Sequence, residues 1–278
     1  MSSINNKKNN EKKPKEKETF RIFGFEINRL FAYFVIYSFI GFVIETIYGV
    51  VRKGVIESRT SMLFLPLCTI YGLGAVVLII SLKYFNKNKF TLFCGGFLTG
   101  TVVEYIVNYC GDKLMHIRWW DYSSYPFNIN GRVCLLFSIF WGILGIYLVR
   151  VLNVRVDRFI DYLKQKFNPM FRRNFLIILA IFMTADFMFT NVAQKMFFTR
   201  VSIEKNVDIV DTNDYLERYT EYYNNPSIKK FFDTYFSDER MLKTYPNINV
   251  LLKNGKQVKL SKFLPEIKPY LIKIYDKK

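Results

Sequence analysis

The sequence predicts an all-α integral membrane protein with about five transmembrane helices and a small α+β domain at its C-terminal end. Hydrophobic residues make up 51% of the 278 residues, and they gather in runs with Lys and Arg between them. The runs are about 20 residues long, which at ~1.5 Å per helical residue matches a hydrocarbon core of ~30 Å. They are about twice the length of barrel strands, so helices are predicted. The predicted spans are Phe31–Val51, Met62–Leu82, Phe90–Tyr109, Val133–Leu152 and Phe175–Phe198.

The distribution of basic residues predicts the topology. The flank before the first span carries eight Lys and Arg and residues 153–174 carry six, whereas the segments before spans two, three and four carry three each. Because Lys and Arg concentrate on the cytoplasmic side, we expect a cytoplasmic N-terminus and an extracytoplasmic C-terminal domain. Basic flanks beside anionic lipid also explain the net charge of +17, so the lipid bilayer is the expected partner and nucleic acid is not.

The segments outside the spans have distinct compositions. Residues 1–30 are predicted as a basic cytoplasmic tail that ends in a short interfacial helix, and residues 153–174 as a basic cytoplasmic loop. Residues 199–278 are polar enough for a small extracytoplasmic domain. Within it, aromatic residues at helical spacing predict two helices, and Asn254-Gly255 predicts the turn of a β-hairpin.

The membrane core of residues 31–152 contains an internal repeat. The run from Gly41 to Tyr48 matches the run from Gly100 to Val107 in its glycine, valine, glutamate and isoleucine positions, 59 residues apart. Spans two and four correspond more loosely, since Tyr71-Gly72 parallels Trp141-Gly142. We therefore interpret the core as two copies of a helix pair, related by a pseudo-twofold axis along the membrane normal.

Two carboxylates within the spans are the leading candidates for function. A charged side chain in mid-membrane costs about 2.5–3.5 kcal/mol on insertion scales, so Glu45 and Glu104 need a reason to be there. In one hypothesis both face a central cavity and bind a cation, a proton or a cationic headgroup. In the other, an arginine such as Arg59 or Arg132 neutralises each glutamate and fixes the bundle. The residues leave both hypotheses open.

The fifth span carries a polar stripe at four-residue spacing, formed by Asp186, Thr190 and Gln194. On a helix these side chains share one face. We expect Asp186 to pack against the core, with a relay as the alternative.

The loop before the fourth span holds the densest cluster of unusual side chains. An interfacial aromatic belt explains its adjacent tryptophans, but it does not explain the surrounding polar residues. We predict a re-entrant or cap-like loop that orients a ligand headgroup at the outer mouth of the core. Its candidate residues are Trp119, Trp120, Asp121, Tyr122, Asn128 and Asn130, followed by Arg132.

Several motifs resemble a known family. They are Tyr37-Ser38-Phe39-Ile40-Gly41, Leu65-Pro66-Leu67-Cys68-Thr69-Ile70-Tyr71-Gly72, Arg118-Trp119-Trp120-Asp121-Tyr122, Asn130-Gly131-Arg132 and Trp141-Gly142. This pattern resembles the bacterial family named putative ABC-transporter permease, CmpB-like or type IV. The resemblance implies a transport component of the bacterial cytoplasmic membrane. The chain has no G-x-x-x-x-G-K-[ST] phosphate loop, so a separate nucleotide-binding ATPase subunit is expected, with residues 153–174 as its docking candidate.

Three function classes follow. The first is a membrane transport or permease component that binds a small cationic or amphiphilic substrate at the paired glutamates. The second is an intramembrane enzyme acting on lipid or lipid-linked substrates, and the third is a non-transporting scaffold or regulator of an envelope complex. The single histidine, His116, excludes a multi-histidine metal site, so an enzyme would depend on carboxylates alone. No cofactor is expected, and a homo-oligomer remains open.

Overall fold

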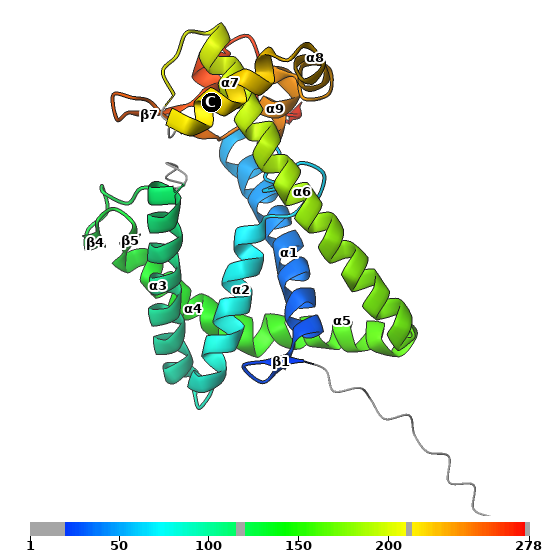
Figure 1. Ribbon diagram of the computed structural model, residues 1–278. Helices are drawn as coiled ribbons and strands as arrows, with labels where there is room; N and C mark the ends of the chain where they lie inside the picture. Colours follow the sequence, from blue (N-terminus) through cyan, green and yellow to red (C-terminus); the bar gives the residue numbers. More distant parts are fainter. Residues whose placement is uncertain (1–19, 115–119, 210–212, 276–278) are drawn as a thin grey trace, which may run out of the picture.

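The computed structural model describes residues 20–114, 120–209 and 213–275. It confirms the predicted class: helices dominate, and four of those described are long and apolar enough to cross a membrane. Figure 1 shows a helix bundle with the C-terminal domain at one end and helix α5 lying across the other end, where the described N-terminal residues also lie.

Three helices begin before and end after the spans predicted for them. They are α1 (Ile27–Lys53), α3 (Lys89–Leu114) and α6 (Pro169–Glu204). Helix α6 has 36 residues, which at ~1.5 Å per residue makes it about 54 Å long. Helix α1 ends in a left-handed cap at Gly54, with φ +72°. Glycine adopts this conformation without steric cost, so the chain can turn sharply there.

The second span is shorter than predicted. Helix α2 covers Thr69–Leu82, followed by a 3₁₀ turn at Lys83–Phe85, whereas residues 62–68 form an irregular loop. Pro66 cannot donate a helical hydrogen bond. The backbone N–H groups just before it bond instead to a carboxylate on α6, described below. Because residues 62–68 are apolar, their composition resembled that of a continuing helix.

The fourth span continues into a helix of a different direction. Helix α4 (Leu135–Tyr147) passes through a π-helical turn at Leu148–Leu152 into α5 (Asn153–Lys166). The segment expected as a basic loop is therefore largely helical. Val156 and Ile160 are buried on one face of α5, and its opposite face is exposed and basic. This amphipathic pattern explains why α5 lies across the end of the bundle instead of crossing it.

The N-terminal segment differs from the predicted interfacial helix. Strands β1 (Arg21–Ile22) and β2 (Phe25–Glu26) form a hairpin directly before α1. Its two turn residues, Phe23 and Gly24, both have positive φ, as a two-residue hairpin turn requires. Phe at such a position is uncommon, so the pattern did not predict a turn.

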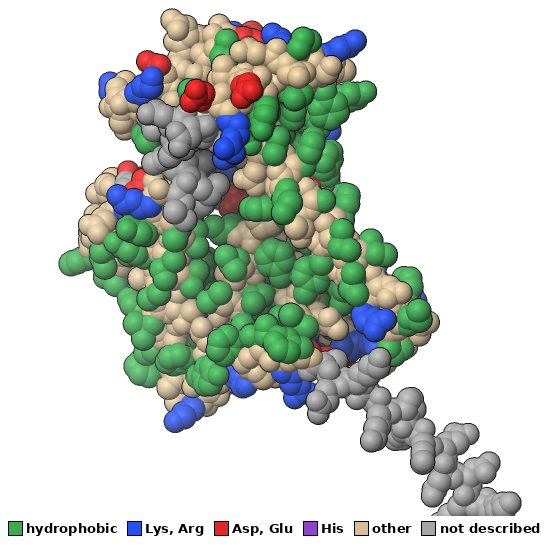
Figure 2. All heavy atoms as spheres, in the orientation of Figure 1, with side chains coloured by type: hydrophobic (Ala, Val, Ile, Leu, Met, Phe, Trp, Pro, Cys, Tyr) green, Lys and Arg blue, Asp and Glu red, His purple; other side chains and the backbone are tan. Residues whose placement is uncertain are grey.

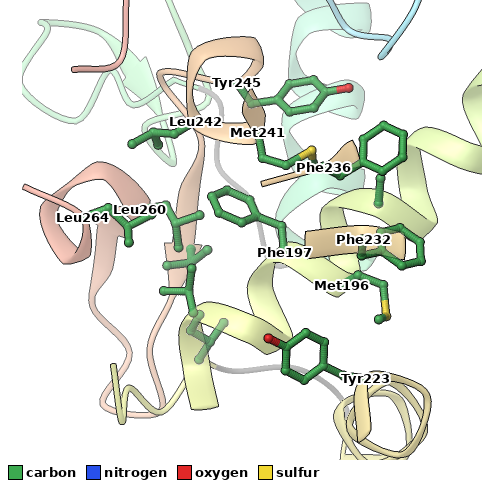
Figure 3. Packing of buried hydrophobic residues seen from close by; sticks show 14 residues of the cluster. Met196, Phe197, Tyr223, Phe232, Phe236, Met241, Leu242, Tyr245, Leu260 and Leu264 are labelled. Atoms are coloured by element: carbon green, nitrogen blue, oxygen red, sulfur yellow. The ribbon is translucent and has the colours of Figure 1, made fainter. Parts of the chain in front are cut away.

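The C-terminal domain contains the predicted helices and hairpin. Its helices are α7 (Asn213–Asn224), α8 (Pro226–Tyr235) and α9 (Asp238–Thr244), and its hairpin consists of β6 (Asn249–Leu251) and β7 (Gln257–Lys259), followed by a 3₁₀ turn at Leu260–Phe263. Figure 3 shows Met196 and Phe197 of α6 among the core residues of this domain. The domain is thus built around the end of α6 and begins before residue 199.

A second connection ties the domain to α1. Strand β3 (Val55–Ile56) directly follows α1 and pairs antiparallel with β8 (Ile272–Lys273) near the C-terminal end. The domain is therefore held at the ends of both α1 and α6.

The bundle surface is apolar. Figure 2 shows hydrophobic side chains over this face of the bundle, between the C-terminal domain and Lys and Arg side chains at the opposite end. Large side chains such as Phe39, Leu98 and Ile178 are about half exposed or more. A surface of this kind is stable in lipid, so the chain is a multi-pass membrane protein.

Candidate functional site

The two helix pairs share one contact. In the first pair, Gly41 of α1 packs against the ring of Tyr71 on α2, and in the second pair Gly100 of α3 packs against the ring of Trp141 on α4. At either glycine an added Cβ would overlap the aromatic side chain. Glycine is therefore required for each aromatic residue to cover the neighbouring helix, as in other close helix contacts within membranes.

Each aromatic residue also donates a hydrogen bond to a glutamate, which lies one helical turn after the glycine on the same helix. The Tyr71 hydroxyl donates to Oε1 of Glu45 at 2.7 Å. The Trp141 indole Nε1 donates to Oε2 of Glu104 at 3.0 Å. Each glutamate thus contacts the second helix of its own pair. In the described part of the chain no side chain hydrogen-bonds both carboxylates, and α2 packs between α1 and α3.

Glu45 has a basic partner. Nη1 of Arg59 lies 3.7 Å from its Oε2, and Nη2 of the same guanidinium lies 3.0 Å from Glu57. Glu57 is buried and also accepts hydrogen bonds from Lys53 at 2.8 Å and from Asn247 at 3.1 Å. A polar network therefore runs from Tyr71 on α2 through Glu45, Arg59 and Glu57 to the C-terminal domain.

Glu104 has only neutral partners. It is 7% exposed, and besides the Trp141 bond it accepts a hydrogen bond from the Tyr122 hydroxyl at 2.8 Å. Among the described residues no Lys or Arg lies within ion-pair distance of it. Arg132 instead pairs with Asp112 at 2.5 Å and covers the ring of Tyr109. The sequence hypothesis that an arginine neutralises each glutamate thus fits the geometry of Glu45 and not that of Glu104.

The loop before α4 positions Tyr122. The backbone N–H of Tyr122 donates to the carbonyl of Gly131 at 2.7 Å, and the Tyr122 ring stacks on that of Phe137 with centroids 4.5 Å apart. The Trp120 indole donates to the carbonyl of Arg132 at 2.9 Å, which fixes the two ends of the loop together. Burial raises the pKa of the Tyr122 phenol, and the adjacent Glu104 carboxylate raises it further. The phenol therefore stays protonated and keeps donating to Glu104.

Other predicted site residues in this loop stabilise the loop itself. Asp121 accepts from the backbone N–H of Ser123 at 2.9 Å, and Asn128 accepts from that of Gly131 at 3.0 Å. The Asn130 amide donates to the Tyr105 hydroxyl at 3.1 Å. Strands β4 (Asn128–Ile129) and β5 (Val133–Cys134) form a short hairpin around this turn. Trp119 lies outside the described residues.

Asn108 was not predicted as a site residue. It lies one helical turn after Glu104 and is fully buried. Its amide nitrogen donates to the carbonyl of Trp120 at 2.9 Å, whereas its Oδ1 has no hydrogen-bond donor among the described residues. The role of Trp141 was also missed, although the repeat alignment of Trp141 with Tyr71 was the signal that pairs each aromatic residue with a glutamate.

Asp186 holds the loop before α2. It is 2% exposed, and its carboxylate accepts backbone hydrogen bonds from Leu63 at 3.2 Å, Phe64 at 3.2 Å and Leu65 at 3.1 Å. The Thr190 hydroxyl donates to it as well. This geometry supports the packing role. Among the described residues no group of three or more His, Cys, Asp or Glu side chains is placed to hold a metal ion.

A comparison of the sequence with models of known protein families identifies the family of this chain. The family model described as putative ABC-transporter type IV matches residues 32–191. The chain belongs to this family. The match covers more than half of the chain and includes Glu45, Glu104 and Asp186, while most of the C-terminal domain lies beyond it. Neither a curated protein nor a solved structure matches the chain. Membership in the ABC-transporter type IV family confirms the resemblance and supports a role in membrane transport.

Proposed function

We propose that this member of the ABC-transporter type IV family is the membrane-spanning component of a transporter and binds a cationic substrate, or the cationic part of an amphiphilic one, at Glu104. One observation carries the proposal: Glu104 is buried in a membrane helix with no counter-ion among the described residues. An intramembrane carboxylate without a counter-ion is costly, which makes it a candidate functional group.

The surroundings of Glu104 suit a cation. A carboxylate can accept about four hydrogen bonds, and Tyr122 and Trp141 supply two. The unused Oδ1 of Asn108 is a further acceptor on the same helix face. The aromatic rings of Tyr122 and Trp141 can add cation–π attraction, which is strongest in a site away from water. Glu45 already has Arg59, so we narrow the paired-glutamate hypothesis to Glu104 and interpret Glu45 as its structural counterpart.

The energy source is proposed to be a separate ATPase subunit that docks at α5. The exposed face of α5 carries Arg155, Arg158 and Lys166 beside Phe159 and Tyr162. Basic residues favour the cytoplasmic side, so we propose that the end carrying α5 is cytoplasmic and that the C-terminal domain is extracytoplasmic. ATP binding would then occur on the partner, since the chain has no phosphate loop.

Ligand-dependent stability tests the Glu104 site. Wild type, Glu104→Gln and Glu45→Gln are purified in detergent and melted across a panel of inorganic and organic cations, pH values and lipids. A ligand at about 100 times its Kd should stabilise wild type by about 2.7 kcal/mol. We expect Glu104→Gln to lose this stabilisation and Glu45→Gln to keep most of it. A cation that stabilises wild type and Glu104→Gln equally would remove the site from Glu104.

Tryptophan fluorescence provides a second readout. In a Trp119→Phe background the remaining tryptophans are Trp120 and Trp141, and the indole of Trp141 bonds Glu104 directly. Binding of the cation should change the emission of Trp141. An unchanged spectrum at a ligand concentration that raises the melting temperature would place the ligand elsewhere.

A further inference from the structure

A cleft lies where the loop between α1 and α2 faces helix α9 of the C-terminal domain. Its volume is about 530 Å³, which is within the ~300–1,000 Å³ range of small-molecule sites. One wall is apolar and includes Phe42 and Leu63. The other wall belongs to α9 and carries Glu239, Arg240 and Lys243, so its net charge is positive. The cleft is separate from Glu104, whose partners come from α4 and the loop before it.

The apolar wall extends into the membrane region. Phe42 lies eleven residues before Lys53, the last residue of α1, which corresponds to about 16 Å along the helix axis. At the cleft, Phe64 is 48% and Leu271 is 56% exposed. A hydrocarbon chain could therefore enter the cleft from the bilayer.

The basic wall retains hydrogen-bonding capacity. Nη1 of Arg240 donates to the carbonyl of Tyr235 at 2.9 Å, and its guanidinium stands over the ring of Phe236. Its Nε and Nη2 have no acceptor among the described residues. Lys243 pairs with the exposed Glu239 at 2.6 Å, one helical turn away, and exposed pairs of this kind contribute little, so the ammonium can exchange its partner.

We propose that this cleft binds an anionic lipid, with a phosphate headgroup on Arg240 and Lys243 and a hydrocarbon chain against Phe42 and Leu63. Phosphate oxygens match the fork of a guanidinium and the point charge of an ammonium. A zwitterionic headgroup would bring its own cation to two basic side chains and is therefore disfavoured. The proposal is independent of the Glu104 site, which takes a ligand of the opposite charge.

The test titrates the full-length protein in a nonionic detergent with three probes: dioctanoyl phosphatidylglycerol, dioctanoyl phosphatidylcholine and inorganic phosphate. Binding is followed by the melting temperature and by native mass spectrometry. The variant is Arg240→Gln/Lys243→Gln. The control is Lys229→Gln/Lys253→Gln, which removes the same charge from exposed positions of this domain that do not line the cleft.

We expect phosphatidylglycerol to bind wild type and the control alike, and to bind Arg240→Gln/Lys243→Gln about tenfold more weakly, which is one decade in Kd. Phosphatidylcholine and inorganic phosphate should bind more weakly than phosphatidylglycerol. If the double variant melts early without ligand, Lys243→Gln carries the same test with a loss of about threefold.

Three outcomes would overturn the proposal. Equal binding of phosphatidylglycerol by the cleft variant and wild type would place the lipid elsewhere. Equal binding of the two lipids would mean that the headgroup charge is not selected. Inorganic phosphate binding as tightly as phosphatidylglycerol would mean that the apolar wall contributes nothing.

Discussion

The helix pair α1–α2 and the helix pair α3–α4 have the same internal contact and different electrostatics. In both, a glycine accommodates an aromatic ring that bonds a glutamate. In the first pair the glutamate joins an arginine network that reaches the C-terminal domain. In the second pair it has only neutral donors among the described residues. The comparison teaches that two copies of a repeat can keep the same packing while their glutamates differ in role. The glutamate of the first copy is part of a structural ion-pair network, and that of the second copy has no counter-ion among the described residues.

The loops that precede α2 and α4 differ in a similar way. The first is held from outside, because Asp186 of α6 accepts its backbone N–H groups. The second is held by internal contacts, such as those of Asp121 with Ser123 and Asn128 with Gly131, and by side chains of α3 in its own helix pair. The loop of the first pair is thus bonded to α6, whereas the loop of the second pair contacts Glu104 of the same pair.

The largest expected effect separates the two loops. Asp186→Ala would leave the backbone N–H groups of Phe64 and Leu65 without an acceptor, whereas that of Leu63 keeps the Thr190 hydroxyl. Each unpaired group costs about 1–3 kcal/mol when buried, so we expect a loss of at least about 2 kcal/mol in the free energy of unfolding. Asp121→Ala, at an exposed position, should cost about 1 kcal/mol. Unfolding in mixed micelles with increasing dodecyl sulfate measures both. Equal losses would mean that the first loop does not depend on α6.

The next effect tests whether the glycine contacts are equivalent. Gly41→Val and Gly100→Val each force a side chain into an aromatic ring, and overpacking of this kind costs about 1–3 kcal/mol. Gly74→Val is the matched control, since an added Cβ there meets nothing within 4 Å. We expect similar losses at positions 41 and 100 and almost none at 74 in the same unfolding assay. A loss of stability at only one of the two glycines would mean that the two contacts are not equivalent.

A smaller effect distinguishes the two glutamates by sign. Glu45→Gln removes a partner of Arg59 and should lower the free energy of unfolding by about 1 kcal/mol, because the pair is only partly buried. Glu104→Gln should leave it unchanged or raise it, since an amide removes a buried charge that has no counter-ion. Both are compared with wild type in cation-free buffer. Destabilisation by Glu104→Gln as large as that by Glu45→Gln would indicate an ionic partner for Glu104.

The most local expected effect concerns the link to the C-terminal domain. Asn247→Ala removes a hydrogen bond to Glu57 and another from Lys53, which together contribute about 1–2 kcal/mol locally. Hydrogen exchange should become faster in β3 and β8 and stay unchanged in β4 and β5. Faster exchange in both strand pairs would show that the two helix pairs are coupled through the domain.

Much of the fold could be predicted because its causes are local. Runs of apolar residues fix α1, α3 and α6, and Asn254-Gly255 fixes the C-terminal hairpin, whose register places Val250 opposite Val258. The start of α2 could not be predicted, because the conformation of residues 62–68 depends on Asp186, more than 120 positions later in the chain. The direction of α5 likewise depends on contacts with α1, including the ion pair of Arg29 with Asp157.

The candidate site was predicted in its residues but not in its partners. Glu45 and Glu104 follow from the cost of an intramembrane charge, which is a property of each position alone. Arg59 and Arg132 each lie shortly before the predicted second span of their helix pair. Yet Arg59 pairs with Glu45, whereas Arg132 pairs with Asp112. A choice between two carboxylates depends on the course of the intervening loop, which the pattern of charges does not encode.

The length of α6 has a mechanical consequence. Its N-terminal half exposes Ile178 and Ile181 to lipid, while Met196 and Phe197 in its C-terminal half are buried in the core of the C-terminal domain. One continuous helix therefore joins the bilayer to that domain as a lever arm. For a rod of about 54 Å, a tilt of about ten degrees moves the far end by about 9 Å. Because β3 and β8 also fasten the domain to α1, a change in the angle between α1 and α6 would shear the domain across its own core.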